Sequence, residues 1–169
     1  LGALALHDTR REVRMMKKSS WVSLGLVLLL GGFLPASSAG AGEITAQKAM
    51  VYKSPTCGCC SKWIDHMEDN GFEVEFKNVS NVAPIRRMNG VPSNFASCHT
   101  AIIGGYFIEG HVPAEDVKRL LKERPDVAGL AVPRMPIGSP GMEGPNPEPY
   151  QVLAVGKDGT IEVFARHEP

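Results

Sequence analysis

Three of the four cysteines in this chain stand within four residues, in the segment Cys57-Gly58-Cys59-Cys60. At most one disulfide can close inside such a segment, because bridges between adjacent or one-apart cysteines depart from ordinary disulfide geometry. The fourth cysteine, Cys98, is followed directly by His99. Sulfur donors gathered at this density suit a soft metal ion, Cu(I) before Zn(II). The cysteines therefore predict a metal site.

Residues 1–41 are predicted to be an upstream extension and a cleaved secretory signal peptide. The basic pair Lys17-Lys18 precedes an apolar run from Trp21 to Leu34, and Ala39-Gly40-Ala41 fits a small-residue cleavage site. The apolar run is shorter than the roughly twenty residues of a membrane-spanning helix, so no stable membrane insertion is expected after cleavage. These features predict a periplasmic protein.

Residues 42–169 are expected to form one domain with a modest core. Five of the 18 basic and two of the 18 acidic side chains lie in the leader, which leaves 13 basic and 16 acidic, a net charge of −3. No cluster of basic residues remains, and nucleic acid is therefore not an expected partner.

Hydrophobic periodicity predicts an α/β domain with the element order β-α-β-α-β-β-α. The expected strands are Ala46–Lys53, Phe72–Val79, Thr100–Ile103 and Tyr106–Val112, and the expected helices are Cys59–Asn70, Asn81–Asn89 and Pro113–Glu123. Two further β-rich runs around Lys157-Asp158-Gly159 predict a C-terminal hairpin. Between them and the last helix, Pro133–Pro149 holds six prolines and three glycines in seventeen residues. This Pro/Gly/Met-rich segment is expected to be an irregular surface loop.

This order, with the spacing of Cys57 and Cys60 at the first strand-to-helix junction, resembles a thioredoxin-like domain. In that geometry Cys57 lies in the loop and Cys60 in the first helical turn. Backbone N–H groups and the helix dipole at this position stabilise a thiolate. The same effect favours metal binding, because the thiolate is the ligand. A cysteine in the facing position, as expected for Cys98, adds a fourth sulfur.

Two alternatives to the metal site stay open. Cys57 and Cys60 could be the exchanging pair of a thiol–disulfide oxidoreductase, although a third thiol at Cys59 would offer a competing route of attack. In an exported protein the cysteines could also form structural disulfides.

Methionine and histidine extend the set of candidate ligands. Met135 and Met142 lie in a loop too rich in proline and glycine to bury them as core, and a thioether is a soft donor for Cu(I). His99 and His111 stand near strand ends and could each supply an imidazole. Zinc would require a tetrahedral set of cysteine and histidine, whereas the methionines favour copper. The other histidines of the domain are expected to be solvated: His66 and His167.

Four motifs can be compared with known families: Cys57-Gly58-Cys59-Cys60, Ser97-Cys98-His99-Thr100, Gly110-His111-Val112-Pro113 and the run from Met135 to Met142. Together with the signal peptide, they resemble the periplasmic CopG-type proteins of Gram-negative copper-resistance loci. The resemblance covers the chain from about Met50 to its end. Residues before Met15 have no counterpart in such a family, and translation is expected to start at Met15 or Met16.

The resemblance implies a thioredoxin-like domain that binds several copper ions as a sulfur-rich cluster and handles Cu(I) and Cu(II) during copper stress. The implied cluster ligands are Cys57, Cys59, Cys60 and Cys98, with His111 and the methionine loop nearby. We therefore expect a copper-binding protein of copper tolerance, acting by sequestration, transfer or Cu(I)/Cu(II) interconversion. Its expected partners are copper ions and other periplasmic copper-resistance proteins. No catalytic residue is assigned, and any enzymatic activity would be copper-centred electron transfer.

Overall fold

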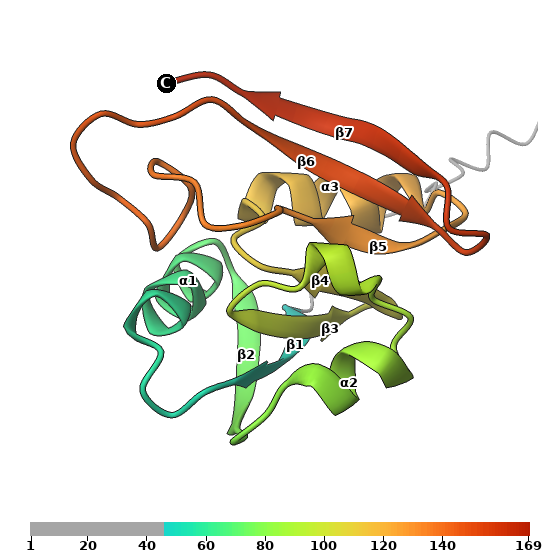
Figure 1. The fold of residues 1–169 in the computed structure, drawn as a ribbon, viewed down its shortest axis with the longest axis horizontal. Coiled ribbons are helices and arrows are strands. Elements are labelled where there is room, and N and C mark those ends of the chain that lie inside the picture. The colour runs from blue at the N-terminus through green and yellow to red at the C-terminus, as the bar shows by residue number, and fades with distance from the viewer. Residues whose placement is uncertain (1–45) are drawn as a thin grey trace, which may run out of the picture. The chain divides into compact units, whose positions relative to one another are not determined.

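The computed structural model describes residues 46–169, which form a seven-stranded sheet with three α-helices (Figure 1). The α/β class expected from the sequence is confirmed. The predicted upstream extension and signal peptide in residues 1–41 lie outside the described residues. Within residues 46–169, no helix is both long and apolar enough to cross a membrane.

The strands span Gln47–Lys53 (β1), Phe72–Asn78 (β2), His99–Ile103 (β3), Tyr106–Glu109 (β4), Val127–Ala131 (β5), Tyr150–Gly156 (β6) and Ile161–His167 (β7). Their order in the sheet is β2-β1-β3-β4-β5-β6-β7. β1 is parallel to β2 and β4 is parallel to β5, whereas the other neighbours are antiparallel. The antiparallel β6 and β7 form the predicted C-terminal hairpin.

The three helices are α1 (Gly58–Asp69), α2 (Ala83–Met88) and α3 (Ala114–Glu123), and a short 3-10 turn follows α2 at Ser93–Phe95. Up to α3 the helices and strands follow the expected order β-α-β-α-β-β-α, with the 3-10 turn as an addition. Pro133–Pro149 contains no helix or strand, as expected from its prolines and glycines.

Alternation along the strands sends side chains to opposite faces of the sheet, and each face has its own core. On one face Ile108 packs in a cluster with Trp63 of α1 and Leu120 of α3. On the other face Phe107 packs in a second cluster with Phe95 of the 3-10 turn. Helix α1 is therefore held by a buried tryptophan, and this fixes the position of its N-terminal turn.

Two features of the strands differ from the expectation. β5 was not foreseen, and β4 ends at Glu109 rather than at Val112. Gly110 has a φ of +74°, and a Cβ there would lie 2.9 Å from the Val132 carbonyl oxygen. The chain leaves the sheet at this glycine and turns toward α3. After α3 the chain passes through β5 to Pro133, where the long loop begins.

Candidate metal centre

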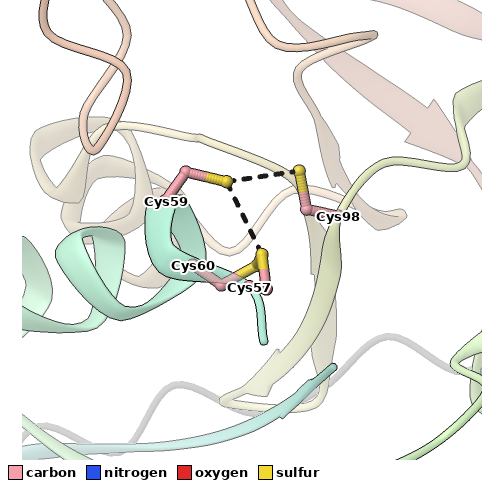
Figure 2. Close-up of side chains that lie close together, drawn as sticks. All are labelled: Cys57, Cys59, Cys60 and Cys98. Atoms are coloured by element: carbon pink, nitrogen blue, oxygen red, sulfur yellow. Dashed lines mark hydrogen bonds between the residues drawn. A yellow bond between two sulfur atoms is a disulfide. The ribbon is translucent and has the colours of Figure 1, made fainter. Parts of the chain in front are cut away.

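The four cysteines converge where α1 begins (Figure 2). Cys57 is the N-cap of α1, and Cys59 and Cys60 lie in its first turn. The backbone N–H of Cys57 donates to the Ser54 carbonyl, which closes the turn between β1 and α1. Cys98 directly precedes β3, the antiparallel neighbour of β1. The four sulfur atoms all lie within 4.8 Å of one another.

Within this cluster the cysteines are of two kinds. Cys57 and Cys60 are joined in a disulfide, with their Cα atoms 5.4 Å apart. Cys59 and Cys98 are free thiols. The Sγ of Cys59 lies 3.5 Å from that of Cys57 and 3.7 Å from that of Cys98. Cys59 is thus the sulfur that connects the disulfide to Cys98.

Cys98 also lies beside two of the other donors expected from the sequence, Met135 and His111. Its Sγ lies 2.6 Å from the Sδ of Met135 and 3.5 Å from Nε2 of His111. Two thiols, a thioether and an imidazole therefore form a continuous chain of soft and borderline donors. Opening the disulfide would add two more thiolates to it.

The orientation of His111 is set by the long loop. Its Nδ1 lies 2.7 Å from the carbonyl oxygen of Pro140, which can only accept a hydrogen bond, so Nδ1 carries the proton. Nε2 therefore keeps its lone pair and faces Cys98. An imidazole whose second nitrogen donates to a carbonyl is the usual arrangement of a metal-binding histidine.

His99 and Met142, also expected as donors, make none of the described contacts with a cysteine sulfur. The His99 ring is fully buried, 4.4 Å from the Trp63 ring and 5.2 Å from the His111 ring. Neither of its ring nitrogens has a hydrogen-bond partner among the described residues. Met142 is half-buried, and its backbone N–H donates to Ser139 within the loop.

Burial governs the protonation of this site. It raises the pKa of the Cys98 thiol to about 11, with a further contribution from the charge on neighbouring Cys59. Burial lowers the pKa of His111, and it holds the pKa of His99 well below 6.5. At neutral pH the site therefore presents a protonated Cys98 beside neutral imidazoles. A metal ion would have to displace a proton from Cys98 but not from Nε2 of His111.

A buried ion pair fixes the segment that carries Cys98, and sequence reasoning missed it. Nε of Arg86 lies 2.7 Å from Oε1 of Glu109, which is fully buried in β4. The same carboxylate accepts hydrogen bonds from the Ser97 backbone N–H and the Thr100 hydroxyl, and Arg86 also donates to the Ser97 carbonyl. The available signal was a lone carboxylate in the apolar run that begins at Tyr106. The backbone N–H and the carbonyl of Ser97 are therefore both held, one residue before Cys98.

The Pro133–Pro149 loop packs closely against the start of α1 (Figure 1). A Cβ at Gly141 would lie 2.6 Å from the Cys59 carbonyl oxygen and 2.9 Å from the backbone nitrogen of Trp63, and Gly141 has a φ of +84°. Only glycine permits both this contact and this backbone conformation. The close contact places the Pro140 carbonyl against His111.

Met135 is the exposed member of the donor set, with 47% of its surface accessible. It lines a cavity of about 400 Å³ together with residues from both ends of the loop and from β6. An ion or a small carrier could therefore reach the cluster from the Met135 side.

The two histidines expected to be solvated are not, so that expectation was wrong. Nε2 of His66 accepts a hydrogen bond from the Ala114 backbone N–H at the start of α3. His167 lies 2.7 Å from an oxygen of Asp116 and stacks on Tyr150, with ring centroids 4.8 Å apart. Both side chains attach to the first turn of α3, one from α1 and one from β7.

Comparison with known proteins gives the following matches. Residues 95–142 match a family model described as "Protein of unknown function, DUF411". Two solved structures, "Copper resistance protein copG" Form 2 and Form 1, each match with a TM-score of 0.70. Form 2 is 42% identical, covering 73% of this chain and 100% of that chain, and Form 1 is 41% identical, covering 74% and 100%. No curated protein matches.

Proposed function

Because the chain belongs to the CopG family of copper resistance proteins, we propose that it binds copper as a protein of copper tolerance. It holds several copper ions on its clustered thiolates, for sequestration, transfer or Cu(I)/Cu(II) interconversion. The observation that carries the proposal is the single group of four cysteines within 4.8 Å, extended by a thioether and a neutral imidazole.

The donor set favours copper over zinc. In the reduced protein four thiolates would surround the start of α1, with Met135 and Nε2 of His111 on the side of Cys98. Thiolate and thioether are the ligands that Cu(I) prefers. Zinc sites use cysteine, histidine and carboxylate ligands, so the contact between Met135 and Cys98 has no role in a zinc module. His99 and Met142 are weaker candidate ligands, because neither makes a described contact with a cysteine sulfur. Their side chains would have to move to bind the same ions.

We infer that the segment from β1 to α3 is a thioredoxin-like unit. The order β2-β1-β3-β4, with β1 parallel to β2 and antiparallel to β3, supports this. So does the position of Cys57 and Cys60 at the start of α1. Export to the periplasm rests on the signal-peptide features of residues 1–41, and the proposed partners are copper ions and other copper-resistance proteins of that compartment.

The test is elemental analysis of reduced protein loaded anaerobically with Cu(I), alongside titration of free thiols. We expect more than one copper per chain, with the thiols protected. Cys98→Ser and Met135→Leu should retain less copper. Met88→Leu is the matched control, because Met88 is an exposed methionine of α2 outside the cluster. Absence of retained copper in the unmodified protein would refute the proposal.

A thiol–disulfide oxidoreductase is the second candidate, because Cys57 and Cys60 form a disulfide at a helix N-terminus. It predicts that Cys57→Ser abolishes exchange with an external disulfide while Cys59→Ser retains it. Equal sensitivity of the two variants would exclude this function.

A further inference from the structure

The four cysteines of the cluster divide into a bonded pair and an unbonded pair. Cys57 and Cys60 already share a disulfide, whereas Cys59 and Cys98 remain thiols although their sulfur atoms are only 3.7 Å apart. The described contacts of Met135 and His111 with the cluster are made with Cys98. Because Cys57 and Cys60 can close a disulfide, the reduced form of this pair can donate two electrons, whereas Cys59 and Cys98 are the pair provided with further metal donors.

We propose that the reduced Cys57/Cys60 pair is a built-in two-electron reductant of Cu(II), and that Cys59 and Cys98 capture the Cu(I) produced. This inference rests on the proposed copper-binding function. Each of two Cu(II) ions accepts one electron, the Cys57 and Cys60 sulfurs join in one S–S bond, and the two thiols release two protons. The products are two Cu(I) ions, one disulfide and two protons, so charge and electrons balance.

Backbone geometry assigns the reducing role to this pair. The Cα atoms of Cys57 and Cys60 are 5.4 Å apart, well inside the range in which a disulfide closes without backbone movement. Cys59 could bond to Cys57 only across one intervening residue, or to Cys60 as its direct neighbour, and both arrangements are unfavourable. Cys60 is fully buried and Cys57 is half-buried, so an incoming ion reaches the pair at Cys57.

Capture follows from the position of Cys59. Its sulfur lies 3.5 Å from Cys57 and 3.7 Å from Cys98, so an ion reduced at Cys57 can pass to Cys59 and then to Cys98 and Met135. These are soft donors, which bind Cu(I) in preference to Cu(II). Binding of the product therefore favours the forward reaction. Oxidation of Cys57 and Cys60 also removes two thiolates from the site. Copper reduction therefore limits the number of ligands that remain to bind Cu(I).

The experiment starts with full-chain protein reduced completely and freed of reductant under anaerobic conditions. Cu(II) is added with a chromogenic Cu(I) chelator, and Cu(I) formation, thiol loss and the disulfide position are measured by absorbance, thiol titration and peptide mass spectrometry. We expect a fast phase yielding two Cu(I) per chain, with two thiols lost to a Cys57–Cys60 bond, as a two-electron couple requires.

Cys57→Ser is the decisive variant, because serine is favoured at the N-cap position that Cys57 occupies and the helix should form normally. Its fast phase should be slower by at least about tenfold, since the remaining cysteines cannot close the same bond. Met88→Leu should behave as the unmodified protein. A disulfide between Cys59 and Cys98, or an unchanged fast phase in Cys57→Ser, would overturn the inference.

Anaerobic loading with Cu(I) separates this inference from the proposed function, because it needs no electrons from the protein. If Cu(I) binds but added Cu(II) is not reduced, the inference fails and the copper-binding function stands. If Cu(II) is reduced but Cu(I) loading leaves no copper on the protein, the copper-binding function fails, and so does the capture of Cu(I) by Cys59 and Cys98.

Discussion

Nε2 of His111 lies 3.5 Å from Sγ of Cys98, and the two side chains have complementary protonation states. The Pro140 carbonyl holds the proton of the imidazole on Nδ1, and burial keeps the proton of the thiol on sulfur. Copper binding at this pair would therefore be coupled to the loss of one proton from Cys98.

This coupling predicts a pH dependence. Burial raises the pKa of Cys98 to about 11, so throughout the neutral range each rise of one pH unit makes the thiolate about tenfold more available. Apparent Cu(I) affinity should rise accordingly between about pH 6 and pH 8 in an anaerobic competition titration. Cys98→Ser should show a shallower slope. Equal slopes in the two proteins would contradict a protonated Cys98.

His99 gives a second prediction, on the stability of the copper-free protein. Burial holds its pKa in the folded state well below 6.5, and His111, Arg86 and Lys53 add to the effect. As pH falls through 6.5 the unfolded chain takes up the proton first, so stability present above 6.5 is lost below it. The loss contributed by His99 approaches about 1.4 kcal/mol per pH unit.

His99→Phe removes the titrating group but keeps a ring against Trp63. Urea unfolding of the variant should therefore show a smaller fall in unfolding free energy between about pH 7 and pH 5. Parallel curves for variant and unmodified protein would contradict the assignment. Copper content of the same variant tests whether His99 is a ligand.

The donor residues could be predicted from the sequence, because cysteine, methionine and histidine are recognisable as metal donors from residue type alone. Cys57, Cys59, Cys60 and Cys98 do lie together, with Met135 and His111 beside Cys98. Glu109 and Arg86 could not be found in this way. The ion pair joins residues that are far apart in the sequence. It holds the Cys98 segment because Glu109 is buried, and the presence of a glutamate in a strand does not by itself indicate that it is buried.

Among the secondary-structure elements, β5 was missed for an identifiable reason. Three of its five residues are alanine or glycine, with Gly129 at the centre, so the run has few of the β-branched and aromatic side chains typical of a strand. In the sheet, Gly129 pairs with Phe107 of β4, and a Cβ there would lie 2.1 Å from the Phe107 carbonyl oxygen. The feature that weakens the strand signal is thus what allows β4 and β5 to pair.

Gly129→Ala should therefore destabilise the protein by about 2 kcal/mol or more, because β4 and β5 must separate to admit the methyl group. Gly58→Ala is the matched control: it places the same group on α1, where nothing lies within 4 Å. That variant should be unchanged or up to about 1 kcal/mol more stable. Urea unfolding monitored by tryptophan fluorescence compares them, and equal stabilities would refute the close contact.

For the whole molecule, the pattern of strands and helices was predictable as far as α3, whereas the path of the long loop was not. Prolines and glycines indicate that Pro133–Pro149 is irregular but do not say where it lies. Its position depends on Gly141 against α1 and on the carbonyl of Pro140 at His111, both contacts over long sequence separations. The loop completes the donor set by bringing Met135 to Cys98.

Copper should stabilise this whole arrangement. The donors come from α1, the segment before β3, the turn after β4 and the long loop, so copper bound to the complete set favours the folded chain. At free Cu(I) roughly a thousand times Kd, the gain is about 4 kcal/mol, or roughly 15 °C in Tm. Differential scanning calorimetry of reduced protein, with and without Cu(I), measures it. An unchanged Tm in the presence of bound copper would show that only a local segment is engaged.

If copper binds as proposed, the origin of its donors in distant segments would also make copper retention a test of correct folding. In a chain that is still unfolded, the thiols held close together by sequence alone are the three of residues 57–60. Cys98, His111 and Met135 arrive together only when β3, β4 and the loop have reached their places. A misfolded chain would then bind copper more weakly and lose it to competing ligands, whereas a correctly folded chain would retain it.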